Sequence, residues 1–393
     1  MPATLAEALN DDRVDWPDLR SRYGPVLQLV DVLIGLVPNC DRYLEIWPVG
    51  FRTYNLMVPN FLNLPALLLG RGAPKDLVGL GLYASSRAAS CAYCSAHTCS
   101  FALRRGATEA AVTGEARTPE EQATVALAEG LSTMPHHHDP ARTDELAALI
   151  GADEAEWVAM GVAMMGFLNK FMDGMGVELE QGAVDDVAQM IEPTGWAVGQ
   201  HGWAGAGSDG SGGPPAPDSF GTVLRVGRNA PGAVLLERRW MRGLPRSAPD
   251  LRRHLQEQYG YDEPLLTAMN HGKPRRALGA MLRHNLDPAQ SDLGLDTKAL
   301  CGLVFAVMAE NELLVAASRA LASHHGVAPA LIDAAAAYAE RAGRKPGAGI
   351  DPADRTNGAE APASNGTNDA GDGPFDAHTG AALAMAAAMA PSP

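Results

Sequence analysis

The chain has 393 residues, of which 46% are hydrophobic and 6% aromatic, and its formal net charge is -15 at pH 7. This length allows more than one hydrophobic core, since domains hold roughly 150 residues. Nucleic acid and anionic membranes would repel so negative a chain, so we expect neither as a main partner. No segment resembles a secretion signal or a membrane span, and we expect a cytoplasmic protein.

Abundant Ala, Leu and Val, with little β-type alternation of polar and branched residues, predict an all-α fold. The first clear helix opens at residues 73–76. Ser90 is then placed as the N-cap of a second helix, which begins at Cys91 and ends at Gly106. This second helix carries most of the chain's cysteine.

Three more helices are expected before residue 180. Thr118 precedes a proline and two glutamates, a capping-box pattern that predicts a helix to about Gly130. Thr143 and Asp153 open the other two, and the last of these is rich in apolar residues up to Gly176.

The composition divides the chain into four regions. Residues 20–190 form a helical domain that contains the cysteine cluster. Residues 191–245 are rich in Gly and Pro and are interpreted as a linker, because such a segment buries too little apolar area to fold alone. Residues 246–343 form a second helical region, and residues 344–393 a disordered tail.

The second helical region weakly repeats the first. Residues 298–303 echo residues 75–80, and Gly326 corresponds to Gly106. Where the thiols would fall, residues 311–314 read NELL. We therefore expect a degenerate repeat without redox chemistry.

Residues 90–99 read SCAYCSAHTC and hold three of the five cysteines. Cys91 and Cys94 lie one helical turn apart, a spacing that allows a small disulfide ring, and His97 follows one turn later. A helix N-terminus and a histidine both favour the reactive thiolate. A peroxide would oxidise one thiolate to a sulfenic acid, and the second thiol would condense with it to a disulfide.

Other readings of the cysteines and histidines are weaker. The ligands on one short helix, Cys99 included, cannot converge on zinc tetrahedrally, so we expect no metal. Inert core cysteines remain an alternative for the cluster, and they are the favoured interpretation of Cys40 and Cys301. Residues 136–138, three histidines between prolines, are interpreted as a solvated loop.

Residues 86–97 resemble the signature of the carboxymuconolactone decarboxylase and alkylhydroperoxidase D-like superfamily, in its C-x-x-C redox branch. Residues 167–180 are similar to the closing helix of that family's unit. The resemblance covers about residues 40–185 well and residues 250–340 only faintly. It implies an all-helical bundle that forms homo-oligomers and needs neither haem nor metal nor another cofactor.

The resemblance also implies roles for the site residues. Cys94 attacks the hydroperoxide, Cys91 resolves the sulfenic acid, and His97 is the candidate proton relay. The helix dipole by itself would favour Cys91 slightly as the more activated thiol. An external thiol or a protein reductant completes the cycle.

Two positions depart from the family pattern. The family's histidine falls on Thr98, so His97 stands one residue early and is rotated by about 100° around the helix. The relay glutamate falls on Gly79, and no acidic residue lies between Asp76 and Cys91. We expect an incomplete relay, which Arg87 or Tyr93 would have to compensate.

The sequence thus predicts a thiol-dependent peroxidase or related disulfide oxidoreductase. Two alternatives stay open. One is a redox-sensing or structural protein whose disulfide does not turn over. The other is a carboxymuconolactone-type decarboxylase, which is disfavoured because decarboxylases of this superfamily do not require the cysteine pair.

Overall fold

The structure is a computed structural model that describes residues 4–133, 138–204, 217–290 and 293–343, with Phe375, Thr379, 382–383 and 385–387 of the tail. Every regular element within these residues is a helix, and one isolated bridge joins Leu179 to Trp203. The predicted all-α fold is confirmed. The rest of the predicted tail, and His136 and His137, lie outside the described residues.

The chain separates into two compact units, whose borders differ from the predicted ones. Among the described residues, the first unit takes those up to residue 252 and residues 264–285, and the second takes residues 253–263 and those from 286 onward. The helix Gly272–Leu286 therefore belongs almost entirely to the first unit, although its sequence was assigned to the second repeat.

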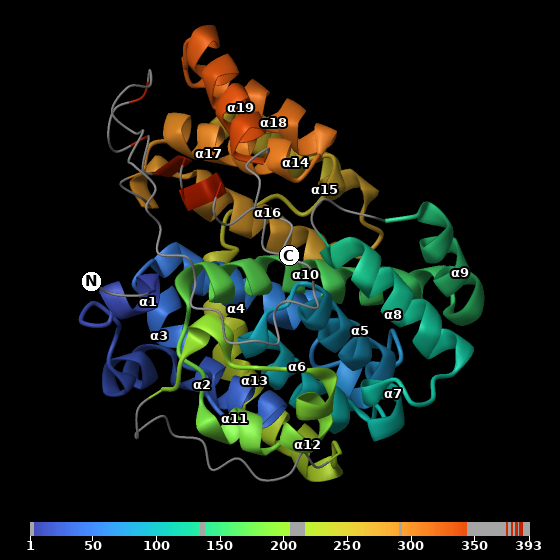
Figure 1. Cartoon of the computed structure of the whole chain (residues 1–393). Helices are drawn as coiled ribbons and strands as arrows, with labels where there is room; N and C mark the ends of the chain where they lie inside the picture. Colours follow the sequence, from blue (N-terminus) through green and yellow to red (C-terminus); the bar gives the residue numbers. More distant parts are fainter. Residues whose placement is uncertain are drawn as a thin grey trace. The chain divides into compact units, whose positions relative to one another are not determined.

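The first unit is a bundle of long and short helices (Figure 1). Its elements are α1 (Leu5–Ala8), α2 (Trp16–Ile34), α3 (Cys40–Leu44), α4 (Pro48–Phe61), η1 (Leu67–Leu69), α5 (Lys75–Ala88), α6 (Ala92–Arg105), α7 (Glu109–Thr113), α8 (Pro119–Ser132), α9 (Pro140–Ile150), α10 (Ala152–Met175), α11 (Gln181–Asp185), α12 (Ala188–Ile191), η2 (Glu192–Thr194), η3 (Gly199–His201), α13 (Phe220–Trp240), α15 (Leu265–Ala268) and α16 (Gly272–Leu286). The helix α14 (Ala248–Tyr259) crosses the border between the units.

The cysteine helix α6 lies at the centre of this bundle and packs against α2, α5, α10 and α11. Nearly all its side chains are buried. It lies very close to α5 at Gly79, where an added Cβ would stand 2.7 Å from the Cα of Ala102. Only glycine fits at that crossing without moving the backbone of a helix.

The predicted linker contains a long helix. α13 begins with a capping box between Ser219 and Thr222 and packs against α2. The linker interpretation was wrong for this part. It gave weight to the Gly and Pro content and overlooked apolar residues at helical spacing, which include the buried Val226 and Trp240. Pro231 is accommodated inside the helix.

Predicted helix boundaries agree with the structure where a cap defines them. The capping box of Thr118 and Glu121 is present, and α8 follows it. Gly106 ends α6 in the left-handed conformation with φ 102°. The helix expected from Thr143 begins earlier, at Pro140, because Asp139 caps it.

The second unit contains η4 (Pro288–Gln290), α17 (Leu295–Met308), α18 (Glu312–His324) and α19 (Pro329–Gly343). α17 packs against both α18 and α19. Its core is aliphatic and includes Leu303, Val304 and Ala335.

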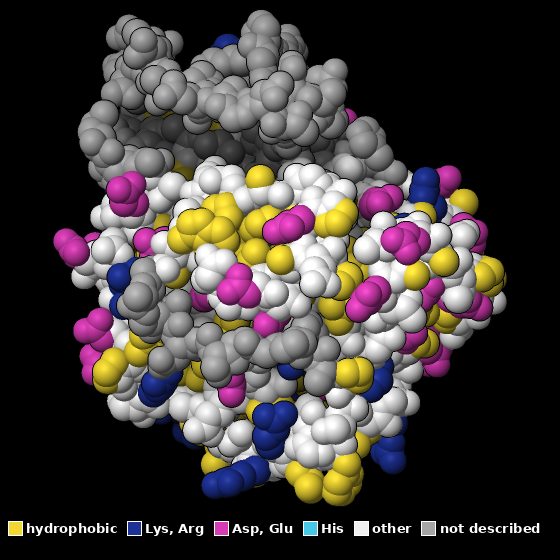
Figure 2. Space-filling view, turned by 60° about the horizontal axis from the view of Figure 1, so that its bottom comes forward, with side chains coloured by type: hydrophobic (Ala, Val, Ile, Leu, Met, Phe, Trp, Pro, Cys, Tyr) yellow, Lys and Arg dark blue, Asp and Glu magenta, His cyan; other side chains and the backbone are white. Residues whose placement is uncertain are grey.

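Among the described residues, no helix has the length and apolarity that a membrane crossing requires. Figure 2 shows acidic side chains spread over one face of the molecule, with basic ones standing apart from each other among neutral and hydrophobic groups.

Candidate functional site

The turn between α5 and α6 places both thiols at the start of the cysteine helix. Ser90 adopts a left-handed conformation with φ 55°, and Cys91, not Ser90, is the N-cap. The predicted N-cap was one residue early. The Cys91 Sγ consequently accepts a hydrogen bond from the backbone N–H of Cys94, at 3.2 Å, so this sulfur faces the positive end of the helix directly.

Both thiols are free and buried, with 0% of Cys91 and 3% of Cys94 exposed. Burial raises the pKa of each thiol above its ordinary value. The interaction between the two thiols lowers the pKa of Cys94 and raises the pKa of Cys91. Of the two, Cys94 is therefore favoured as the nucleophile by its partner thiol.

The other cysteines lie in environments that suppress ionisation. Burial raises the pKa of Cys99 to about 12 and that of Cys301 to about 11. Cys40 is also buried, and its pKa is raised well above the ordinary value. These three residues are poor candidates for a thiolate.

His97 lies one turn after Cys94, but neither of its ring nitrogens contacts a thiol among the described contacts. Nδ1 donates to the carbonyl oxygen of Tyr93 at 2.9 Å, and the two rings stack at 4.4 Å. Nε2 lies 3.1 Å from the Oε2 of Glu180, at an angle outside that of a directed hydrogen bond. Burial lowers the pKa of His97, but Glu180 and the carbonyl of Tyr93 together outweigh burial, and the pKa is raised.

Glu180 is the buried acidic residue that lies beside His97. It is 2% exposed, and its Oε1 accepts hydrogen bonds from the Tyr93 hydroxyl, at 3.0 Å, and from the backbone N–H of Asn39. The expectation of an incomplete relay considered only the residues before Cys91 and so did not include Glu180; the operation of a relay stays a prediction. A glutamate at position 79 would collide with α6, whereas Glu180 reaches His97 from the loop after α10.

A second histidine and a second acidic residue, His201 and Asp173, lie near Cys91, and the sequence analysis did not identify them. Asp173 lies in the last turn of α10, and His201 ends η3. The ligand-type atoms of Cys91, Asp173 and His201 all lie within 4.8 Å of one another. The segment around His201 is fixed to α6 by the indole of Trp196, which donates to the carbonyl of Ala92 at 3.0 Å.

These three residues have the composition of a metal site, but their hydrogen bonds describe an ion pair. His201 Nε2 donates to Asp173 at 2.9 Å, and Nδ1 donates to the Val177 carbonyl at 3.0 Å. A histidine that donates from both nitrogens has no lone pair left for a metal. The only sequence signal for this arrangement was the pair of tryptophans, Trp196 and Trp203, in a segment otherwise composed like a linker.

An apolar cavity of about 90 Å³ adjoins Cys94 and Cys40 but not Cys91. Cys94 and His97 line it together with side chains such as Tyr54, Met164 and Leu168, whereas Cys91 does not. Of the C-x-x-C pair, Cys94 is therefore the thiol that a small apolar molecule in this cavity would contact. Cys40 also lines the cavity, but its pKa is raised well above the ordinary value.

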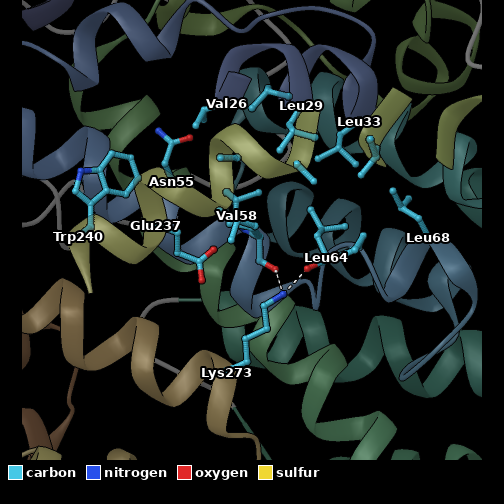
Figure 3. A pocket seen from close by; sticks show the side chains of 17 residues that line it. Val26, Leu29, Leu33, Asn55, Val58, Leu64, Leu68, Glu237, Trp240 and Lys273 are labelled. Atoms are coloured by element: carbon cyan, nitrogen blue, oxygen red, sulfur yellow. Dashed lines mark hydrogen bonds between the residues drawn. The ribbon is translucent and has the colours of Figure 1, made fainter. Parts of the chain in front are cut away.

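A larger cavity of about 210 Å³ lies beside the first and is shown in Figure 3. The two share Val30, Leu33 and Val58 in their walls. Most residues that line the larger cavity are aliphatic, and the exceptions are Asn55, Trp240, Glu237 and Lys273. The ammonium of Lys273 donates to the carbonyl oxygens of Pro59 and Leu64.

Comparisons with known proteins add little to this geometry. No family model matches the chain, and no curated protein matches it. A solved structure described as the debrominase Bmp8 in its apo form is 22% identical, with a TM-score of 0.38. The match covers 45% of this chain and 96% of that one. At this level of similarity it assigns no activity to the chain.

Proposed function

We propose that the chain is a thiol-dependent peroxidase that reduces small organic hydroperoxides through Cys94 and Cys91. The observation that carries the proposal is the apolar cavity that Cys94 and His97 line together, with Cys91 one turn behind Cys94. The resemblance of residues 86–97 to the alkylhydroperoxidase D-like signature supports the same reaction.

The first step forms a bond between Cys94 and one peroxide oxygen. The Cys94 thiolate attacks that oxygen, the O–O bond breaks, and the electron pair leaves with the alkoxide. His97 in its protonated form, which Glu180 favours by raising the pKa, gives its proton to the alkoxide, so an alcohol departs. Cys94 is left as a sulfenic acid.

The second step closes the disulfide. The Cys91 thiolate attacks the Cys94 sulfur, and hydroxide leaves and is protonated to water. Two equivalents of an external thiol then restore the dithiol. The apolar walls favour alkyl hydroperoxides over hydrogen peroxide, because burying an alkyl group contributes about 0.8 kcal/mol for each CH₂.

Stopped-flow measurement of hydroperoxide consumption by the reduced protein tests this function. We expect cumene hydroperoxide to be consumed faster than hydrogen peroxide, and Cys94→Ser to abolish the fast phase. The matched control is Cys301→Ser, which removes a partly exposed thiol of the second unit and should leave the rate unchanged. A wild-type rate no greater than that of free cysteine would reject the peroxidase.

The alternative of a redox-sensing disulfide is favoured by one observation, namely that burial raises the pKa of both thiols. A sensor needs to react once and slowly, whereas a peroxidase must turn over. The same experiment separates them, because a sensor would form the disulfide without sustained consumption in the presence of a thiol reductant.

A further inference from the structure

Cys91 occupies a charged environment that the chemistry of Cys94 does not use. His201 and Asp173 approach it from η3 and from the end of α10, outside the C-x-x-C helix. Cys91 is 0% and His201 3% exposed. Burying the His201–Asp173 ion pair costs solvation free energy. We therefore expect these charges to interact with a further charged group.

The ring of His201 is held as a cation. Both nitrogens donate, one to the Val177 carbonyl and one to the Asp173 carboxylate. Burial lowers the pKa of His201, but its hydrogen bond to Asp173 and the proximity of Cys91 and Asp173 together outweigh burial and raise the pKa to about 9. An imidazolium at His201 therefore has a ring nitrogen within 4.8 Å of the Cys91 sulfur at neutral pH.

The charges around Cys91 balance when its sulfur is a thiolate. Lys170 lies close enough for attraction to Asp173 and Cys91 to oppose the effect of burial, which lowers its pKa. Lys170 and His201 carry two positive charges, and Asp173 carries one negative charge. A thiolate on Cys91 brings this cluster to neutrality, and the backbone N–H of Cys94 already points at the sulfur. Burial, Cys94 and Asp173 together still raise the pKa of the Cys91 thiol, and His201 acts against them by lowering it, so loss of His201 would raise that pKa further.

We propose that Cys91, His201 and Asp173 form a thiolate-holding site, in which Cys91 is the leaving sulfur when a small thiol reduces the Cys91–Cys94 disulfide. The inference rests on the proposed function only for the existence of that disulfide. His201 and Asp173 are positioning residues, since they act through Cys91.

Reduction of the disulfide proceeds in two thiol–disulfide exchange steps. A thiolate of the reductant enters the cavity that Cys94 lines and attacks the Cys94 sulfur, forming a mixed disulfide. The bond to Cys91 breaks, and its electron pair goes to Cys91, where the imidazolium and the backbone N–H stabilise it. A second reductant thiolate attacks the reductant's sulfur in the mixed disulfide. This releases the oxidised reductant and the Cys94 thiolate.

The test uses the full chain, with the disulfide formed by diamide so that no peroxide chemistry is needed. Dithiothreitol is the probe reductant. We expect His201→Gln to slow reduction about tenfold and to lower the disulfide's potential by about 30 mV, the equivalent of a tenfold change for two electrons. Asp173→Asn should act in the same direction, and Asp173→Glu, which keeps the charge, should restore most of the rate.

The matched control is His138→Gln, because His138 contacts Thr143 in a loop and not a thiol. It should leave the rate and the potential at their wild-type values. A second readout is the ultraviolet absorbance of the Cys91 thiolate in the Cys94→Ser background, which should appear at a higher pH once His201→Gln is added. This readout distinguishes loss of the charge from a general structural defect.

Wild-type potentials in both His201→Gln and Asp173→Asn would overturn the inference. So would stoichiometric binding of added zinc that His201→Gln abolishes, because the three side chains would then be a metal centre. A protein that shows the expected potentials but consumes no hydroperoxide would reject the proposed peroxidase and leave the thiolate-holding site standing.

Discussion

The turn between α5 and α6 has a close counterpart in the turn between α17 and α18. Ser90 and Glu310 both adopt φ values near 55°, at 55° and 53°. The next residue is the N-cap in each turn, Cys91 or Asn311, and its side chain accepts the backbone N–H three residues later. The two turns share a backbone shape and differ in their side chains.

The backbone hydrogen bonds extend this likeness. The N–H of Cys91 donates to the carbonyl of Ser86, and that of Asn311 to the carbonyl of Ala306, each at 3.0 Å. In each turn the N-cap residue stabilises the connection between two packed helices, which is a structural role. The turn itself is therefore a structural feature. Chemistry at the first turn depends on the side chains that the rest of the first unit places beside the sulfurs.

The largest expected effect comes from removing the resolving thiol. Cys91→Ser should keep the fold, because serine is a favoured N-cap. It should abolish turnover while leaving one round of hydroperoxide consumption, with a sulfenic acid trapped on Cys94. Mass spectrometry after thiol blocking identifies the oxidised residue. Sulfenic acid on Cys91 in the Cys94→Ser protein, formed at an undiminished rate, would reverse the two roles.

Moving the cysteine pair to the second turn tests the comparison itself. Asn311→Cys with Leu314→Cys, in a chain that also carries Cys91→Ser and Cys94→Ser, should form a disulfide with diamide. Its reaction with cumene hydroperoxide should be about a hundredfold slower than that of the wild type, because general acid–base groups contribute factors of this size. Wild-type rates at the new position would mean that the turn alone activates the thiols.

A smaller effect is expected at the acid that faces His97. Glu180→Gln removes the charge that raises the pKa of His97, so that pKa should fall and the hydroperoxide step should slow about tenfold at pH 7. Proton NMR of the imidazole and the pH profile of the rate measure both effects. Glu178→Gln is the matched control, since Glu178 pairs with Arg13 away from His97. Equal rates in the two variants would remove Glu180 from the mechanism.

The smallest predicted effect concerns stability around the Cys91 cluster. The pKa of His201 is raised from 6.5 to about 9, so its stabilising contribution is complete below about pH 6.5 and is lost as the pH rises through about 9. Asp173→Asn should lower the free energy of unfolding by about 1–2 kcal/mol at pH 6, since Asp173 supplies part of that shift. Urea denaturation at pH 6 and pH 10 should show this difference shrinking with pH. A difference that is constant across this range would contradict the ion pair.

Local sequence predicted the parts of the site that depend on neighbours along the chain. The spacing of Cys91 and Cys94, the glycine that ends α6 and the capping box at Thr118 each involve a few consecutive residues, and each is present. The N-cap was misplaced by one residue because Ser is the commoner cap, and no composition rule anticipates a left-handed Ser90.

Long-range packing decided the rest. Asp173 and His201 reach Cys91, and Glu180 reaches His97, only because α10 and the segment after it fold back onto α6. Nothing in the immediate sequence of these three residues marks them as parts of the site. The same packing places part of the predicted linker beside the site, where the indole of Trp196 donates a hydrogen bond to α6. The sequence by itself determined an all-helical chain with a thiol pair at a helix start, because helical periodicity and caps are local. The tertiary structure decided which sulfur meets the cavity and which meets the ion pair, because charge and burial depend on residues distant in the chain.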